Sequence, residues 1–405
     1  MLLAILTGIF FTFPVLGIPF FFGGYISKNK GQKILGLFFL AMFMGILGYC
    51  FQNPKTDPDL VRYIEMTKKY SGLGILESFN AGSYENLFII DIWFWAIAQT
   101  GNYQLVAATT CIFTYLIILY ILQDYYWRNN FSLQAKILAT VLVMGVVNFA
   151  FVVNAIRSTV AFLLVLLAVY REFYKNKKNI WTYLCYIIPI FMHFASILLV
   201  VIRFSVIMKK RWIKFFSLAL CFVPVYIEFV VKIINRLPSE MPFISYIQSF
   251  AARALMYFKW NEGGWATVVS NSGYYKLNKC FSLLVLIITI FVFLKLEKQL
   301  GIVWSKEFDS YIMVYFAIIF ACFTMKTPTY QRFTVPIWVF CGSVLTRYLE
   351  ETRLKMKRNK KAMYCGVIII LMFLGYFLNG YMLNSMIPIQ EYIRDVFVFN
   401  WVIKL

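Results

Sequence analysis

The sequence predicts an all-α protein that crosses a membrane many times as one transmembrane domain, residues 1–405. Its 405 residues are 61% hydrophobic, 20% aromatic and only 14% charged. Too little polar surface exists to cover a core of this size in water. Apolar runs long enough to cross ~30 Å of hydrocarbon recur from end to end. These observations exclude a soluble globular protein and a soluble domain with a single anchor.

The position of the basic residues predicts the topology. The chain has 39 Lys and Arg and 18 Asp and Glu, a net charge of +21. One arrangement of spans places 24 of the 39 on the same side, in six short segments at 28–33, 128–136, 171–178, 203–214, 295–306 and 347–361. The positive-inside rule makes that side cytoplasmic. Membrane topology thereby accounts for the excess charge, and no nucleic-acid partner is expected.

This arrangement contains about twelve spans, two long outer loops, at 52–85 and 235–278, and both ends of the chain outside. The first half supplies spans at 2–24, 33–51, 104–122, 136–153 and 156–172, and then a pair of compact helices within 180–208 that bends at 189–195. The second half supplies spans at 213–234, 279–295, 310–326, 332–349 and 362–383.

Two further segments are helical without crossing the membrane in this interpretation. The run from Leu87 to Ala98 is too short for a full span and contains Asp91. We expect a re-entrant or interfacial helix, because a full crossing would move the basic segment 171–178 outside. Residues 244–260 repeat apolar side chains at a helical period, with Arg253 near the other face, which is typical of a helix lying in the interface plane.

Three ionisable residues are predicted to share one depth. Arg157 stands 14 residues before a basic cytoplasmic segment, the only histidine, His193, stands 15 residues after one, and Arg332 stands 15 residues before one. At 1.5 Å per residue, each lies roughly 21–23 Å from the cytoplasmic segments, in the outer half of the bilayer. Arginines at helix ends also extend to lipid headgroups, so this alternative stays open for both.

The chemistry that uses such a set is the attack of a sugar hydroxyl on a sugar attached to a lipid pyrophosphate. Arg157 and Arg332 can neutralise the charge that grows on the pyrophosphate leaving group. His193, or an aspartate of the first outer loop, can accept the proton of the attacking hydroxyl. This scheme needs no cofactor, and we expect no metal, although an acidic pair in an outer loop can hold a divalent ion.

The same residues resemble a known family. Arg157-Ser-Thr-Val-Ala161, then a basic turn and His193-Phe-Ala-Ser196, is similar to the pattern of the EpsG-like branch of the Wzy-type polysaccharide polymerases. Asp57 to Tyr63, Glu85 and Arg332-Phe-Thr-Val-Pro336 also look similar to it. One position departs from the family pattern, where a glutamine often follows the arginine and this chain has Ser158.

The resemblance implies a membrane glycosyltransferase that joins undecaprenyl-pyrophosphate-linked repeat units on the outer face of a bacterial plasma membrane, in capsule, exopolysaccharide or O-antigen synthesis. Its partners would be the lipid-linked oligosaccharide, membrane lipids, and a flippase and chain-length regulator of the same pathway. Arg157, His193 and Arg332 would be catalytic, and the substrate-binding residues would be Asp57, Asp59, Arg62, Tyr63, Glu85 and Arg253.

Two other functions stay open at this point. A flippase for lipid-linked oligosaccharide would place charges along a two-sided central cavity and would not need a histidine at one depth. A membrane acyltransferase could also use a single histidine, but the sequence contains no signature of an acyl donor.

Overall fold

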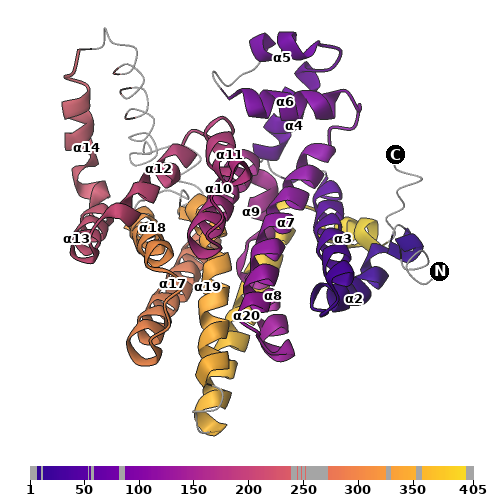
Figure 1. The fold of residues 1–405 in the computed structure, drawn as a ribbon. Helices are drawn as coiled ribbons and strands as arrows, with labels where there is room; N and C mark the ends of the chain where they lie inside the picture. Colours follow the sequence, from indigo (N-terminus) through magenta and orange to yellow (C-terminus); the bar gives the residue numbers. More distant parts are fainter. Residues whose placement is uncertain are drawn as a thin grey trace. The chain divides into compact units, whose positions relative to one another are not determined.

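The computed structural model describes residues 7–10, 12–52, 54–55, 59–81, 87–238, 244, 248, 251, 272–324, 330–352 and 358–397. Every regular element among these residues is helical (Figure 1), which confirms the predicted fold class.

The α-helices, labelled as in Figure 1, are α2 Pro14–Tyr25, α3 Lys30–Tyr49, α4 Asp59–Lys69, α5 Ile75–Ala81, α6 Phe88–Ala98, α7 Leu105–Arg128, α8 Leu133–Val146, α9 Phe149–Asn154, α10 Ile156–Val169, α11 Ile180–Ile190, α12 Ser196–Val201, α13 Lys210–Cys221, α14 Val223–Ile234, α17 Gly273–Leu300, α18 Lys306–Thr324, α19 Tyr330–Thr352, α20 Arg358–Met386 and α21 Ile389–Phe397. A π-helical turn, Tyr170–Tyr174, follows α10, and a 3-10 helix, Ile202–Ile207, follows α12.

Four helices of the described chain are long and apolar enough to cross a membrane, namely Lys30–Tyr49, Leu105–Arg128, Gly273–Leu300 and Ala362–Met386. Further apolar helices are shorter, among them α2, α6, α8 and α11. The chain is thus an integral membrane protein, while the count of twelve spans stays a prediction. Helix α6 is a short apolar helix of 11 residues, as the sequence predicts, and its re-entrant or interfacial position stays a prediction.

Two of the expected spans are interrupted. The segment 136–153 consists of α8 and α9, because the chain is extended at Val147 and the side chain of Asn148 caps the next helix by accepting from the Phe151 N–H. The segment 213–234 consists of α13 and α14, which meet at Phe222, and Pro224 lies in the first turn of α14. The first predicted outer loop contains two helices, α4 and α5.

The described chain divides into two compact units. Unit 1 comprises Met1–Glu172, Lys177–Ile197 and Val335–Leu405, and unit 2 comprises Phe173–Asn176 and Leu198–Thr334.

The centre of unit 1 is an antiparallel pair of helices, α3 and α7, against which α2 packs. The Tyr25 hydroxyl donates to the Leu119 carbonyl at 2.9 Å, and the Gln123 amide donates back to the Tyr25 carbonyl at 2.8 Å. At one end of the pair, the Asn102 amide donates to the Tyr49 hydroxyl at 2.8 Å. Helices α4, α5 and α6 form a layer at this end, which we call the cap end of unit 1 (Figure 1).

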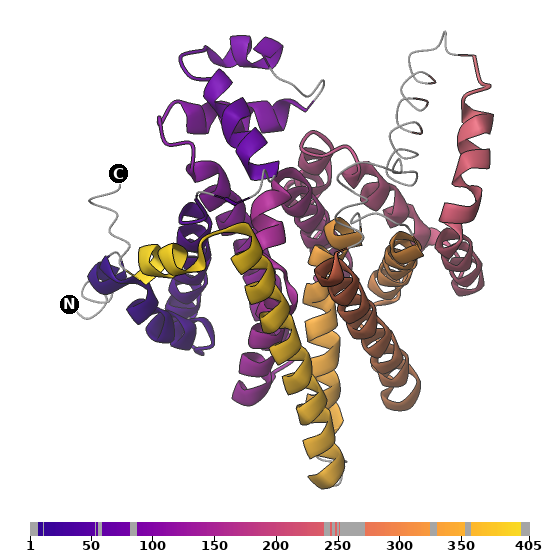
Figure 2. The same ribbon diagram turned by 180° about the vertical axis from the view of Figure 1, so that it is seen from behind.

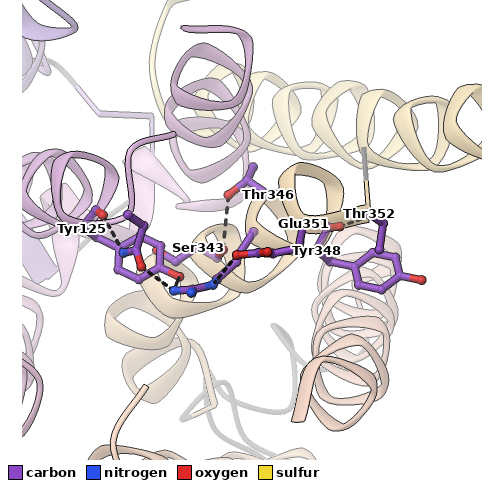
Figure 3. A network of polar contacts seen from close by, with 8 residues as sticks. Tyr125, Ser343, Thr346, Tyr348, Glu351 and Thr352 are labelled. Carbon is purple, nitrogen blue, oxygen red and sulfur yellow. Dashed lines mark hydrogen bonds and ion pairs between the residues drawn. The ribbon is translucent and has the colours of Figure 1, made fainter. Parts of the chain in front are cut away.

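The opposite end of unit 1 contains the turn at 28–33, Arg128 and Lys136, and we call it the basic end. Here Arg347 of α19 donates to Asn129 at 2.5 Å and to the Tyr125 hydroxyl at 3.3 Å, and it pairs with Glu351 at 3.5 Å (Figure 3). These contacts join α19 to the end of α7. Because the turns before α3 and after α7 lie at this one end, the structure groups basic segments that the sequence predicts on a single side.

The break between α8 and α9 is stabilised by α20, which runs beside both helices (Figure 2). The amide of Asn379 donates to the carbonyls of Gly145 and Val147, at 2.8 and 3.1 Å, and so satisfies acceptors that the interrupted helix leaves without a helical partner. Gly375 lies against Gly145, with no side chain between the two backbones. Irregular backbone inside an apolar protein is tolerated where neighbouring groups satisfy it in this way.

Unit 2 is built around α18, which packs against α13, α14 and the 3-10 helix. The Tyr311 hydroxyl donates to the Leu199 carbonyl at 3.1 Å, and the Tyr315 hydroxyl donates to the Phe333 carbonyl at 2.9 Å. Lys210 of α13 pairs with Glu297 of α17 at 2.5 Å.

The contact between Gly375 and Gly145 generates a matched pair of variants on α20. A Cβ atom at Gly375 would lie 2.4 Å from the Gly145 carbonyl oxygen, whereas one at Gly380 meets nothing within 4 Å. We expect Gly375→Ala to lower stability by about 1–3 kcal/mol through overpacking. Gly380→Ala should leave stability unchanged or raise it by up to about 1 kcal/mol through helix propensity. Thermal unfolding of the purified chain in detergent measures both, and equal midpoints would contradict the packing described.

Candidate functional site

Arg157 lies in the first turn of α10, directly after a second interruption of the chain. Helix α9 ends at Asn154, Ala155 has non-helical backbone angles, and α10 begins at Ile156 without a side-chain cap. The Ser158 hydroxyl donates to the Ala155 carbonyl at 3.2 Å, and so it is engaged in this junction. The N-terminus of a helix attracts anions through its N–H groups and its dipole, and Arg157 adds a guanidinium at the same place.

Tyr63 of α4 contacts the Arg157 side chain. The Nε–H of Arg157 donates to the Tyr63 hydroxyl at 3.2 Å, and the guanidinium carbon lies 5.5 Å from the centre of the Tyr63 ring. Tyr63 is itself 7% exposed and packs against Phe94 of α6, with ring centres 5.8 Å apart. The α4–α6 layer therefore positions the guanidinium through the Tyr63 ring, which is itself fixed by packing against Phe94.

A buried carboxyl group, that of Asp91 on α6, lies within electrostatic range of this cation. Its side chain is 3% exposed, and its Oδ1 accepts from the Tyr70 hydroxyl at 2.7 Å. The charge of Arg157 acts on Asp91 electrostatically. Tyr70 is also buried, and its carbonyl accepts from Gln99 at the end of α6, so Asp91 is held in a rigid setting.

His193 lies in the turn Phe191–Ala195, between α11 and α12, where the sequence predicts the bend. Its side chain is 6% exposed and meets the Phe162 ring edge-on, with ring centres 5.4 Å apart. The Nδ1 atom accepts from the backbone N–H of Ala195 at 3.2 Å. An imidazole that accepts at Nδ1 carries its proton on Nε2 when it is neutral, so His193 is set up as a hydrogen-bond donor at Nε2.

Arg157 and His193 lie at the same end of unit 1. Phe162, the contact of His193, is five residues after Arg157 on α10, which corresponds to about 7.5 Å along the helix axis. Phe88, at the start of α6, contacts Phe191 in the histidine turn, with ring centres 4.5 Å apart. Helix α6 thus contacts the histidine turn at Phe88 and carries Asp91 about one turn further on.

Two of the predicted substrate-binding residues pair with each other on α4. Asp59 and Arg62 form an ion pair at the protein surface, where the Arg62 side chain is 67% exposed. Asp57, Glu85 and Arg253 lie outside the described residues, as does most of the predicted interfacial helix at 244–260. Tyr63 is therefore the member of the predicted set that contacts Arg157 in the described part of the chain.

Arg332 belongs to unit 2, in the first turn of α19, and its side chain is half-buried. Its neighbours in sequence are firmly anchored. Tyr330 accepts from the Asn278 amide at 3.1 Å and stacks on Phe323, with ring centres 5.0 Å apart. The expectation that Arg332 shares a depth with Arg157 and His193 stays a prediction.

Asp91 and Tyr70 are missing from the residues predicted for the site. A signal for Asp91 was present, because an acid within an apolar run costs free energy unless it is paired or used. Tyr70 gives no such signal, since its role follows from the packing of α4 against α6. Within the described ranges, no three His, Cys, Asp or Glu side chains gather closely enough to hold a metal ion. A metal-independent reaction stays an expectation.

Comparisons with known proteins assign the chain to a family. No curated protein and no solved structure matches the chain. The model of the EpsG family matches residues 33–392, a range that contains both units almost entirely and every candidate residue named above. EpsG is a family of Wzy-like polysaccharide polymerases. The chain therefore belongs to the EpsG family.

Proposed function

We propose that the chain polymerises lipid-pyrophosphate-linked oligosaccharide units, and that Arg157 binds the pyrophosphate of the donor. The observation that carries this proposal is the position of Arg157 in the first turn of α10, where its side chain contacts Tyr63 and its charge acts on Asp91. Membership of the EpsG family supports the class of reaction. The undecaprenyl lipid and a reaction on the outer face of a bacterial plasma membrane, both implied by the resemblance to the family, belong to this proposal.

The proposed step transfers the growing chain from its lipid to the next lipid-linked unit. A hydroxyl oxygen of the acceptor sugar attacks the anomeric carbon of the donor sugar, and a new glycosidic bond forms. The bond between that carbon and the pyrophosphate oxygen breaks, and its electron pair leaves with the lipid pyrophosphate. The hydroxyl proton passes to a base, so that atoms and charge balance. The enzyme accelerates this step mainly by stabilising the charge on the leaving group.

Arg157 suits that task because it is oriented before the substrate binds. The Tyr63 hydroxyl accepts from Nε, and the charge of Arg157 also acts on the buried carboxyl group of Asp91. The planar guanidinium carries five N–H donors, and its geometry suits binding of two phosphate oxygens together. Arg332 remains the predicted second ligand of the pyrophosphate, and Glu85 and Arg253 remain predicted sugar or headgroup contacts.

His193 fits a donor better than a base. With Nδ1 engaged by the Ala195 N–H, its neutral ring presents a proton at Nε2, which can be donated to an oxygen of the substrate. We therefore propose that His193 orients the substrate or stabilises the leaving group. The base is then one of the aspartates that the sequence predicts, Asp57 or Asp59.

Arg157→Ala should abolish polymer and leave the substrate on the outer leaflet. We expect activity to fall by about 10²–10³-fold, the usual effect of removing one charge-stabilising donor. Arg157→Lys keeps the charge but loses the bidentate geometry, so its activity should lie between those of the wild type and Arg157→Ala. The measurement is the length of the polysaccharide in cells that contain equal amounts of each protein. Full-length polymer from Arg157→Ala rejects the pyrophosphate role, and single units left on the inner leaflet favour a flippase.

Asp91→Asn and Tyr63→Phe should lower activity more than they lower stability. Asparagine can still accept from Tyr70 but no longer holds Arg157 by charge, so we expect about a tenfold loss of activity, equivalent to about 1.4 kcal/mol. Tyr63→Phe removes the hydrogen bond that orients Arg157, and we expect this loss to raise the barrier to the reaction by about 1 kcal/mol. Tyr376→Phe is the matched control, because it also removes one hydroxyl, which donates to the Val141 carbonyl away from Arg157. Equal activity loss in Tyr376→Phe would mean that Tyr63 has no specific role.

Substitutions of His193 can show whether this residue acts as a hydrogen-bond donor or as the base. The amide nitrogen of glutamine reaches about the position of Nε2 and donates a hydrogen bond, but glutamine does not titrate near neutral pH. His193→Gln should therefore retain most of the activity that His193→Ala loses. The pH profile of the glutamine variant should keep the shape of the wild-type profile. If both variants are equally inactive while folded, as judged by thermal unfolding, the donor role is wrong.

A further inference from the structure

We propose that Lys33, Trp127 and Lys136, at the basic end of unit 1, form a binding site for the phosphate of an anionic phospholipid. The site lies at the opposite end of α3 and α7 from Arg157, so it is separate from the proposed polymerase site.

One indole ring brings the two lysines together. The Nζ atom of Lys33, on α3, lies 3.6 Å from the centre of the Trp127 ring, and the Nζ atom of Lys136, on α8, lies 3.4 Å from the same centre. The two nitrogens are therefore at most the sum of these distances, 7.0 Å, apart. Two ammonium groups this close repel each other, and a phosphate that contacts both would turn the repulsion into attraction.

The surroundings add further positive charge. Lys33 and Lys28 both act on Lys136 by repulsion. Asp124 is the carboxylate that attracts Lys33. Its Oδ2 already accepts from Arg128 at 2.9 Å and from the Tyr170 hydroxyl at 2.8 Å. The cluster thus retains a surplus of positive charge, which suits an anionic ligand.

The burial of the cluster distinguishes it from a solvated basic surface. Lys136 is 6% exposed, whereas Lys33 and Trp127 are half-exposed and Lys28 is exposed. The site therefore combines one lysine side chain that is largely buried with two side chains that are half-exposed. A lysine whose side chain is largely shielded from water gains from an anionic partner, because the ring of Trp127 offers only part of the compensation for its charge.

Exposed apolar side chains beside the lysines favour a lipid over a free phosphate. Ile34 and Phe38 follow Lys33 on α3, and Leu133 and Ile137 flank Lys136 on α8, and all four are exposed. Acyl chains can cover these side chains while the headgroup phosphate contacts the two ammonium groups. Basic pockets between transmembrane helices bind anionic headgroups in this manner.

The first test compares lipids on the full-length chain in detergent by native mass spectrometry. Phosphatidylglycerol should bind more tightly than phosphatidylcholine. Lys33→Gln and Lys136→Gln should each weaken phosphatidylglycerol binding about fivefold. Lys136→Arg, which keeps the charge, should retain it. Lys178→Gln, at an exposed lysine of another basic segment, is the matched control and should change nothing. Equal binding of the two lipids, or an equal loss in Lys178→Gln, overturns the proposal.

A second measurement needs no substitution. A photoreactive phosphatidylglycerol in vesicles of phosphatidylcholine should label peptides from the start of α3, the end of α7 and the start of α8. Labelling spread over the other basic segments would contradict the site. Millimolar inorganic phosphate should not displace the lipid. Displacement by inorganic phosphate alone would assign the site to a free anion and reject the lipid.

Discussion

The contact between the Arg157 guanidinium and the Tyr63 hydroxyl is the interaction on which the account of the site depends. An arginine at the start of an apolar helix needs partners, because a charge in surroundings of low polarity is otherwise costly. Tyr63 accepts from the Nε–H of Arg157, the charge of Arg157 acts on Asp91, and Tyr63 and Asp91 both belong to the α4–α6 layer. The layer therefore does two things at once. It closes the cap end of unit 1, and it orients the guanidinium that we propose binds the pyrophosphate.

The backbone on the other side of Arg157 is equally specialised. The chain is interrupted at Val147 and again at Ala155, and α20 satisfies the carbonyls of the first interruption through Asn379. These two breaks allow a helix to begin inside the apolar unit. Discontinuous helices of this kind place a positive helix end, rather than a continuous apolar surface, at the level where a charged substrate binds. The close packing of Gly375 on Gly145 therefore supports the first break, and the second break starts the helix that carries Arg157.

Composition and periodicity predicted the helical class, the short helix at Leu87 to Ala98 and the histidine turn, because each follows from local hydrophobicity and from Pro189. The interruptions at Val147 and Phe222 were missed. A continuous apolar run predicts one helix, and the sequence does not show which neighbouring groups will hydrogen-bond to the backbone at a break. Arg157 and Tyr63, both singled out in the sequence, lie in contact in the structure. Asp91 and Tyr70 become visible only when α6 folds against α4, because nothing in the sequence says which apolar segments pack together.

The central claim is that this chain breaks the bond between a sugar and a lipid pyrophosphate. The most direct measurement counts products when the purified chain, in vesicles, receives a lipid-linked repeat unit and no other reagent. We expect one lipid pyrophosphate to be released for each glycosidic bond formed, with oligomers of two or more units appearing at the same rate. Movement of intact lipid-linked units across the vesicle membrane, without release of lipid pyrophosphate, would contradict the account.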